Sequence, residues 1–220
     1  MIDWLKDKYY WFKNYKTLKT FLSSKEEPKI LLFGYPKSGN TWLRFVLYNY
    51  RTLLLNLEEK QTITYDRLNT LQNNIMDRGT IFSPEKGFPL FYRTHKIYKK
   101  TYNLFEKKIF IHRNPLDTLI SAYYFYKERE EPFLDDPKEI REKLHDIDFY
   151  VSYKIDSWIK FYNISIKYAD FVMNYTEMKR FPEKSFVQLI NFLDWDFDVE
   201  LVRKSIEFSS FQEVKKMGIE

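Results

Sequence analysis

Residues 30–42 read ILLFGYPKSGNTW, and this stretch decides the expected fold. Its first four residues form a continuous apolar run, which is typical of a short strand buried on both faces of a sheet. Gly34 ends the run and Gly39 follows it, so the next segment contains two residues with unusual backbone freedom. From Thr41 onward, apolar side chains recur at helical spacing. The stretch therefore predicts a buried strand, a turn and a helix.

The predicted turn is chemically suited to an anion. Backbone N–H groups in such a turn, and the amino end of the helix after it, point toward a bound anion. Lys37 adds a mobile positive charge, and the hydroxyls of Ser38 and Thr41 add donors. The glycine spacing fits the nucleotide-triphosphate loop G-x-x-x-x-G-K-[ST], but Asn40 occupies the lysine position. The turn is interpreted as a phosphate loop unlike that of a standard ATPase, and the alternative is an ordinary glycine-containing turn.

Short apolar segments alternate with helical patterns along the rest of the chain. A helix is expected after Arg113, because Asn114 is a good N-cap and Pro115 suits the first helical position. Strands that alternate with helices favour an α/β fold with a central parallel sheet covered by helices. Further strands are predicted at residues 90–92, 108–111 and 170–174, and further helices at residues 65–76, 146–167, 182–193 and 199–207.

The length of 220 residues suits a single domain over residues 1–220. Residues 1–27 are expected to form an amphipathic helix and a linker, and residues 28–220 the core. Residues 1–22 are predicted to pack one helical face on the domain, and a peripheral membrane contact is the alternative. The apolar positions of that face are Trp4, Trp11, Tyr15, Leu18 and Leu22.

Composition and charge exclude several classes of protein. There are no cysteines, which excludes disulfides, thiolate catalysis and cysteine-bound metals. The net charge of +5 favours anionic ligands, but the charges are mixed along the chain and do not choose among them. No apolar run is long enough for a transmembrane helix, and the amino terminus is not a secretory signal, so a cytoplasmic protein is expected.

A second motif follows the strand predicted at residues 108–111. Residues 113–123 read RNPLDTLISAY. Asp117 and Ser121 are four residues apart and share a helix face. The guanidinium of Arg113 together with the hydroxyl of Ser121 could bind a phosphate. A capped helix with a surface arginine is the alternative when the motif is considered alone.

Together the two motifs resemble the nucleotide site of cytosolic-type PAPS-dependent sulfotransferases, where PAPS is 3′-phosphoadenosine 5′-phosphosulfate. Residues 35–42 resemble the family's 5′-phosphosulfate loop Y-P-K-S-G-T-T-W, with Asn40 as the one departure. Residues 113–121 resemble its 3′-phosphate motif R-N-x-x-D-x-x-x-S. The resemblance implies a P-loop-like sulfotransferase fold and transfer of a sulfuryl group from PAPS to a hydroxyl acceptor. It also implies adenosine 3′,5′-bisphosphate (PAP) as the product, and no metal.

The resemblance also implies three catalytic residues. The family's general base lies in a (K/R)-(S/T)-H segment between the two motifs, and residues 93–95 read RTH. His95 is thereby expected to take the acceptor proton, Lys37 to stabilise the leaving phosphate oxygen, and Arg93 to steady the sulfuryl oxygens. The other two histidines, His112 and His145, match no site of the family and are interpreted as structural.

Nucleotide contacts are likewise implied by the resemblance. Trp42 is expected to stack on adenine, and residues 174–178 and 209–215 resemble the family's Y-E-D-M and T-S-F-x-x-M-K segments. The family's later R-K-G segment, which clamps the 3′-phosphate, has no counterpart here, and Lys215 and Lys216 are candidates for its role. The expected nucleotide-binding residues are Pro36, Ser38, Gly39, Asn40, Thr41, Trp42, Arg113, Ser121, Tyr175, Ser209 and Phe211.

Two other functions stay open on the residues alone. One is a P-loop kinase or NTPase that uses ATP and Mg²⁺, which Asn40 in the lysine position disfavours. The other is a catalytically silent module that binds a nucleotide, or binds a membrane through residues 1–22. The class of the hydroxyl acceptor is not encoded in any motif, and no nucleic-acid partner is expected.

Overall fold

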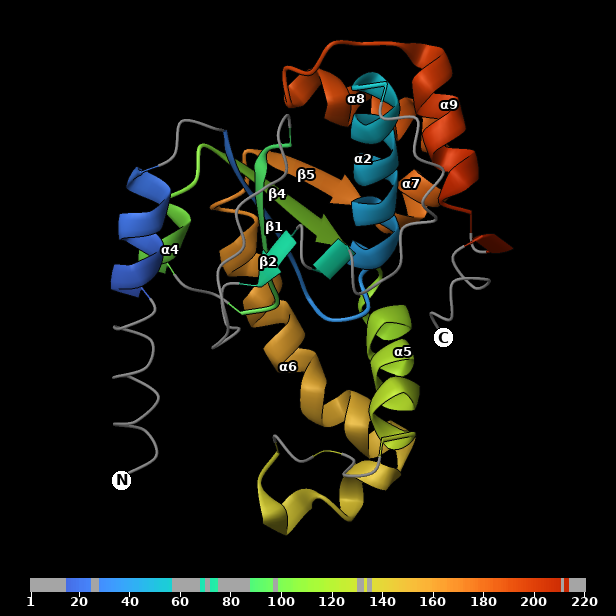
Figure 1. The fold of residues 1–220 in the computed structure, drawn as a ribbon. Coiled ribbons are helices and arrows are strands. Elements are labelled where there is room, and N and C mark those ends of the chain that lie inside the picture. The colour runs from blue at the N-terminus through green and yellow to red at the C-terminus, as the bar shows by residue number, and fades with distance from the viewer. Residues whose placement is uncertain are drawn as a thin grey trace.

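The computed structural model describes residues 15–24, 28–56, 68–69, 72–74, 88–96, 99–129, 133, 136–210 and 212–213. Figure 1 shows a central sheet flanked by helices, with α5 and α6 extending beyond it. A helix over residues 15–23 precedes the labelled elements. These are β1 (Lys29–Gly34), α2 (Asn40–Leu54), β2 (Gln72–Asn74), β3 (Leu90–Thr94), α4 (Lys99–Tyr102), β4 (Lys107–His112), α5 (Pro115–Lys127), the 3-10 turns η1 (Lys138–Ile140) and η2 (Lys143–His145), α6 (Ile147–Ser165), β5 (Phe171–Asn174), α7 (Tyr175–Arg180), α8 (Pro182–Phe192) and α9 (Val199–Phe208).

The sheet has five strands in the order β2-β3-β1-β4-β5, and each neighbouring pair is parallel. The predicted central parallel sheet is therefore confirmed. The central strand β1 pairs with β3 and β4, and its register places Phe33 opposite Thr94 and Gly34 opposite Ile111. Because the strands are parallel, the segments that follow β1, β3 and β4 leave the sheet at one edge. Ligands of open parallel sheets bind at this carboxyl edge.

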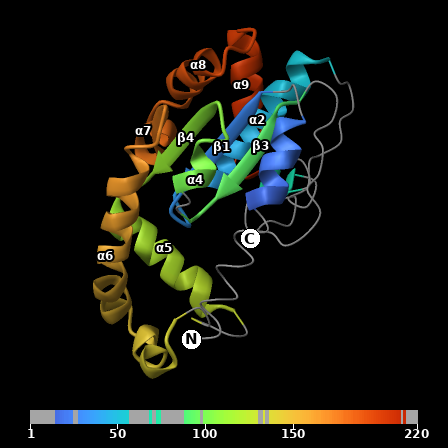
Figure 2. The same ribbon diagram turned by 90° about the vertical axis from the view of Figure 1, so that its left-hand side faces the viewer.

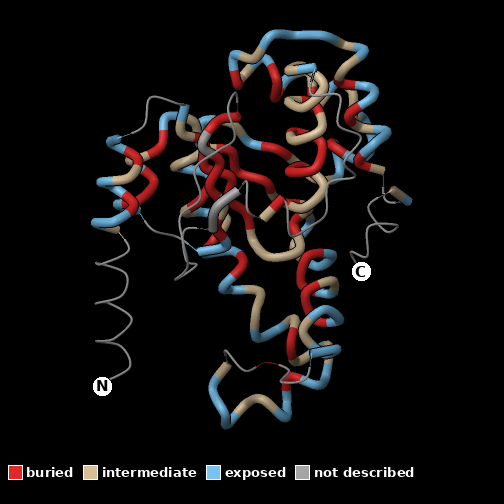
Figure 3. Tube along the Cα trace, in the orientation of Figure 1, coloured by how far each residue is buried: buried red, intermediate tan, exposed pale blue. Residues whose placement is uncertain are grey.

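Two helical layers cover the sheet, one on each face. Ile30 and Leu32 of β1 belong to a core cluster that includes residues of α2, α8 and α9. Leu31 and Phe33 belong to a second cluster, with residues of the helix over 15–23, α4 and α6. Figure 2 shows the two layers, and Figure 3 shows the buried residues concentrated in and around the sheet. A strand covered on both faces needs apolar side chains at every position, which explains the continuous apolar run.

The helix over residues 15–23 packs on the domain through its apolar face. Leu18 and Leu22 are buried in the same cluster as Leu31 and Phe33, so their side chains are not available to a membrane. The predicted packing of the amino-terminal helix is confirmed for this part of it, while Trp4 and Trp11 lie outside the described residues. Within the described residues, no helix combines the length and the apolar character needed to cross a bilayer.

Helices α5 and α6 pack on each other where they extend from the sheet. Asn114 caps α5 as predicted, because its side chain accepts hydrogen bonds from the backbone N–H groups of Leu116 (2.9 Å) and Asp117 (3.3 Å). Asp146 caps α6 in the same way, through the N–H of Phe149 at 2.8 Å. A third core cluster joins the two helices, with the buried members Leu119, Ala122, Tyr123, Phe133, Leu144, Tyr150 and Trp158.

The helix predicted over residues 65–76 is wrong at its carboxyl half. Residues 68–69 are helical, but Gln72–Asn74 form strand β2 at the edge of the sheet. Gln and Asn have little preference for strands, and the segment lacks apolar alternation, so no local pattern indicates β2. The strand exists because its backbone pairs with β3, with Gln72 opposite Phe91 and Asn74 opposite Arg93. The remaining positions of the range lie outside the described residues.

Candidate active site

The turn between β1 and α2 has the backbone of an anion-binding loop. Lys37 and Gly39 both have left-handed backbone angles, with φ of 67° and 100°. Such residues turn neighbouring N–H groups toward one concave side, where an anion can sit. The backbone N–H of Ser38 donates to the Tyr35 carbonyl oxygen at 3.2 Å, which holds the turn closed. A lysine in this conformation costs roughly 1–3 kcal/mol, and such strain is concentrated at functional sites.

Two side chains of the turn hold buried polar groups that have no hydrogen-bond partner among the described residues. The Ser38 hydroxyl belongs to a residue that is 0% exposed, and the Asn40 amide nitrogen to one that is 9% exposed. A buried group left unpaired costs about 1–3 kcal/mol, so native structures rarely keep one without a reason. Both groups can donate to the oxygens of a phosphosulfate, which explains why they are left unpaired in the free protein. The residues present therefore fit the nucleotide implied by the resemblance.

Tyr175, the first residue of α7, joins the two phosphate motifs. A β-carbon at Gly39 would lie 2.3 Å from Tyr175 Cδ2, so only glycine allows the ring to approach the loop this closely. The guanidinium carbon of Arg113 lies 5.0 Å from the centre of the same ring. Arg113 Nε also lies 3.7 Å from the Asp117 carboxylate. The first and second motifs thus converge on one site at the carboxyl edge of the sheet.

Lys37 lies in a crowded cationic environment. Its Nζ is 4.3 Å from the centre of the Phe125 ring on α5. Desolvation lowers the pKa of Lys37, and the nearby charges of Arg113 and Arg129 lower it further, against a smaller opposite effect of Glu128. Cations held this close repel one another, and a bound anion would relieve the repulsion.

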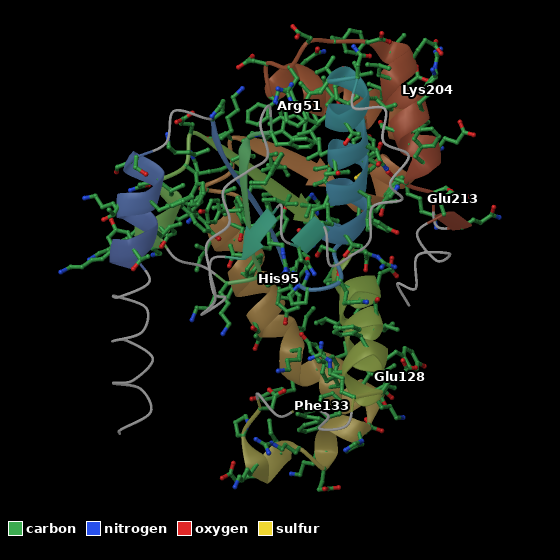
Figure 4. All side chains as sticks on the ribbon, viewed as in Figure 1. Arg51, His95, Glu128, Phe133, Lys204 and Glu213 are labelled. Carbon is green, nitrogen blue, oxygen red and sulfur yellow. The ribbon has the colours of Figure 1, made fainter. Side chains whose placement is uncertain are left out.

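His95 follows β3 at the carboxyl edge of the sheet (Figure 4). Its Nδ1 lies 2.8 Å from the Gly34 carbonyl oxygen. Because a carbonyl can only accept, Nδ1 is assigned the hydrogen, and Nε2 of the neutral ring keeps a free lone pair. Desolvation lowers the pKa of His95, with smaller contributions from Arg93 and Arg44, although the Gly34 hydrogen bond opposes them. The residue retains exposed surface, yet protein surrounds the ring closely enough to favour its neutral, basic form.

Two arginines are near enough to His95 to lower its pKa, and one of them, Arg44, was not predicted. Arg93, on β3, has a buried Nε with no hydrogen-bond partner in the part of the chain that the structure describes, in keeping with a ligand-facing role. Arg44, on α2, is 2% exposed and donates to the Asn69 side-chain oxygen at 2.8 Å. No clear signal for Arg44 is present in the sequence, because a residue next to Leu43 in sequence points away from the apolar face of Leu43 and Leu47, where a charged residue is ordinarily exposed.

The remaining residues of the two motifs lie on the turn, on α2 and on α5. Trp42 packs edge-on against Tyr175, with ring centres 6.4 Å apart. It packs in the same way against Phe186 of α8, at 5.8 Å. Pro36 and Thr41 are half-buried on either side of the loop, and Ser121 is half-buried on α5.

The hydroxyl of Ser209, which was predicted to bind the nucleotide, forms its hydrogen bonds inside the protein. The residue is 0% exposed, and its Oγ donates to the Ser205 carbonyl oxygen at 2.7 Å. The same oxygen accepts from the Asn49 side chain at 2.8 Å. The only proton of the hydroxyl is therefore committed within the protein. Phe211, Lys215 and Lys216 lie outside the described residues.

The rings of the two other histidines pack against aromatic side chains, His112 against Phe110 and Tyr162 and His145 against Phe133. The His112 ring lies 5.2 Å from the centre of the Tyr162 ring and 5.7 Å from that of Phe110. The backbone oxygen of His145 accepts a hydrogen bond from the Tyr123 hydroxyl at 2.6 Å. Both positions agree with a structural role.

Comparison with known proteins leads to a single family. Residues 27–220 match the family described as "Sulfotransferase domain". Sulfotransferase 1E1 of Rattus norvegicus is 29% identical over 216 residues, which cover 92% of this chain and 70% of the rat protein.

Solved structures show the same fold. The structure of mouse sulfotransferase SULT7A1 complexed with PAP has a TM-score of 0.59 at 24% identity and covers 87% of this chain and 66% of that one. Retinol dehydratase in complex with androsterone and inactive cofactor PAP has a TM-score of 0.52 at 14% identity, covering 86% and 66%. Because the family match extends over nearly the whole sequence and the phosphate loop has the expected geometry, the chain belongs to the sulfotransferase family.

Proposed function

We propose that this protein transfers a sulfuryl group from PAPS to a hydroxyl acceptor and releases PAP. One observation carries the proposal: unpaired buried polar groups on Ser38 and Asn40 lie on a loop that Tyr175 connects to Arg113. A nucleotide with anionic groups at the 5′ and 3′ positions would satisfy both motifs at once. The mouse neighbour, which was solved with PAP, supports this assignment.

The chain's own side chains supply the proposed chemistry by position and charge. Sulfuryl transfer resembles phosphoryl transfer, in which alignment and electrostatic stabilisation dominate. The acceptor oxygen forms a bond to sulfur as the bond from sulfur to the phosphate oxygen breaks. His95 Nε2 takes the acceptor proton, since Nδ1 is held by Gly34. Lys37 stabilises the negative charge left on the phosphate oxygen, and Arg93 steadies the sulfuryl oxygens.

The remaining nucleotide contacts belong to the same proposal. Arg113 and Ser121 bind the 3′-phosphate, and Trp42 and Tyr175 contact the adenosine. Further proposed contacts come from Pro36, Gly39, Thr41 and Phe211. Ser209 is a proposed contact as well, but its hydroxyl would have to give up its hydrogen bond to the Ser205 carbonyl oxygen to donate to the nucleotide. Residues 28–220 act as one PAPS-binding and catalytic unit. A cytoplasmic location follows from the resemblance to cytosolic-type members, and a membrane contact of residues 1–22 is an alternative that liposome sedimentation tests.

Nucleotide binding and sulfuryl transfer together test the proposed function. Calorimetry should show binding of PAP in preference to ATP with Mg²⁺, and labelled sulfate should pass from PAPS to members of an acceptor library. His95→Ala should lower turnover by about 10²–10⁴-fold with little change in PAP affinity. Arg113→Ala should weaken PAP binding by about tenfold or more, the loss expected of a charge-assisted hydrogen bond.

The alternatives predict different results. Binding of ATP with Mg²⁺ but not of PAP would indicate a kinase or NTPase. Binding of PAP without transfer to any acceptor would indicate a silent module. Arg203→Ala is a matched control for Arg113→Ala, because Arg203 pairs with Glu183 and Glu200, at α8 and α9, outside the site. The control should leave PAP affinity unchanged.

A further inference from the structure

A row of side chains at intervals of four residues winds along α5 and continues past its end. Asp117, Ser121, Phe125 and Arg129 are spaced by four residues, and Arg113 continues the spacing before the helix. Residues at this spacing are neighbours on a helix surface. The row begins at the residues proposed to hold the 3′-phosphate and passes the ring that Lys37 contacts. It ends at Arg129, about 12 Å beyond Ser121 along the helix direction.

Arg129 shares an aromatic ring with Lys37. The guanidinium carbon of Arg129 lies 4.4 Å from the centre of the Phe125 ring and 5.2 Å from that of Tyr126. Lys37 Nζ lies 4.3 Å from the centre of the same Phe125 ring. The two cations are therefore close together at the carboxyl end of α5, which Glu128 marks in Figure 4. The charge of Arg129 also contributes to the lowered pKa of Lys37.

The charge of Arg129 is not neutralised by an ion pair in the described part of the chain. The salt bridges found there involve other residues, and Arg129 itself is exposed. Its contacts are with ring faces, and a stacked guanidinium keeps its planar edge free to donate two parallel hydrogen bonds. The edge is thus available to a carboxylate or a phosphate.

The donor nucleotide does not account for this arginine. In the proposed function, Lys37 serves the phosphosulfate, and Arg113 and Ser121 serve the 3′-phosphate. Arg129 follows Phe125 along the row, farther from Ser121. In the proposed function, both anionic groups of PAPS lie at the earlier positions of the row. The acceptor is expected to bind on that side of the phosphosulfate, because an in-line reaction needs the acceptor opposite the leaving oxygen.

We propose that Arg129 binds an anionic group of the acceptor, which is therefore a hydroxyl compound that carries a carboxylate or a phosphate. The carbon skeleton of the acceptor lies against Phe125 and Tyr126, and the anion lies at the edge of the guanidinium. This inference rests on the proposed function of the same site. It assigns the class of the acceptor, which no sequence motif encodes.

Matched acceptor pairs test the proposal. Three pairs differ in an anionic group: 3-(4-hydroxyphenyl)propionate and its methyl ester, 4-hydroxyphenyl phosphate and 4-methoxyphenol, and methyl glucuronide and methyl glucoside. Transfer of labelled sulfate from PAPS gives kcat/KM for each. The wild type should prefer the anionic member of at least one pair about tenfold or more, the size of one charge-assisted hydrogen bond. The pair that responds distinguishes carboxylate from phosphate.

Variants then assign the preference to Arg129. Arg129→Gln should bring the preference to about twofold or less, and Arg129→Lys should keep part of it, because lysine retains charge without the fork. Arg180→Gln is the matched control, since Arg180 also stacks on a phenylalanine ring, 5.0 Å from the centre of Phe181 at the end of α7. The control should keep the full preference.

Binding measurements keep the test independent of turnover. The anionic probes should bind protein saturated with PAP more tightly than their neutral partners, and Arg129→Gln should remove the difference. Equal binding of both partners by the wild type would overturn the proposal. So would a loss of PAP affinity in Arg129→Gln that is absent with adenosine 5′-phosphosulfate, because Arg129 would then hold the 3′-phosphate. Failure of the wild type to bind PAP would instead overturn the proposed function.

Discussion

Ser38→Ala should stabilise the free protein and weaken its binding of PAP, two effects of opposite sign from one atom. The Ser38 hydroxyl is fully buried and has no hydrogen-bond partner within the described ranges of the free protein, whereas in the unfolded chain it is hydrated. The turn itself does not depend on the hydroxyl, because the hydrogen bond to Tyr35 comes from the backbone N–H. Removal of the oxygen should therefore leave the loop intact.

The magnitudes of both effects follow from this geometry. An unpaired buried group costs about 1–3 kcal/mol, and a small void left by the missing oxygen offsets part of that gain. A net stabilisation of about 1 kcal/mol is expected, which corresponds to a rise of about 2–4 °C in Tm for a chain of this size. The lost hydrogen bond to an anionic oxygen is worth about 1.5–3 kcal/mol, so Kd for PAP should rise roughly 10- to 150-fold.

Urea unfolding and calorimetric titration with PAP measure the two effects separately. Ser165→Ala is a matched control, because Ser165 is also 0% exposed with an unpaired Oγ. It lies at the end of α6, which leads into the amino end of β5, whereas Ser38 lies at the carboxyl edge of the sheet. The control should raise stability by a similar amount and leave the Kd for PAP unchanged.

The reasoning is refuted if Ser38→Ala loses about 1 kcal/mol of stability while its affinity for PAP stays the same. That result would mean that the hydroxyl stabilises the loop and takes no part in nucleotide binding. A loss of affinity in Ser165→Ala equal to that in Ser38→Ala would also refute it, since the effect could then not be assigned to the loop.

Three further perturbations test separate parts of the structure. Gly39→Ala should destabilise the fold by about 1–3 kcal/mol in urea unfolding, because the left-handed backbone disfavours alanine. It should also weaken PAP binding, because the new methyl group displaces Tyr175. An unchanged affinity for PAP would contradict the contact between Gly39 and Tyr175. Because His95 acts as a base only when neutral and its pKa is lowered, the acid limb of kcat/KM should have its midpoint below the ordinary value of 6.5. A midpoint above that value would contradict the assignment. Asn114→Ala should cost about 1 kcal/mol by loss of the α5 cap, and Asn114→Asp should restore most of it.

Local patterns predicted the architecture because the parallel sheet imposes them on the sequence. The strand over residues 29–34 is buried on both faces, which requires the apolar run that opens the motif. The α5 cap was predictable because Asn is among the residue types preferred at an N-cap and Pro is favoured at the first helical position, as found at Asn114 and Pro115. Strand β2 was not predictable, because the sequence of residues 72–74 carries no strand pattern and the strand is defined by its backbone pairing with β3.

Motif spacing predicted which segments of the site meet, but not how their side chains interact. The turn after β1 and the residues after β4 leave the same edge of the sheet, and Lys37 and Arg113 lie near each other because β1 and β4 are neighbouring parallel strands. The contact of Tyr175 with Gly39 and the ring shared by Lys37 and Arg129 depend on side-chain directions across separate elements. No spacing within one segment encodes such contacts.

Ser38 and Ser209 show why residue type alone does not identify a binding hydroxyl. Both serines match the resemblance and both are completely buried, yet Ser209 has two hydrogen-bond partners inside the protein and Ser38 has none. A hydroxyl with satisfied bonds stabilises the fold without a ligand, whereas an unsatisfied one weakens the fold until a ligand arrives. Ser38 is therefore the stronger candidate for a contact with the nucleotide, because its buried hydroxyl lacks a hydrogen-bond partner among the described residues, whereas the match to a motif is common to both serines.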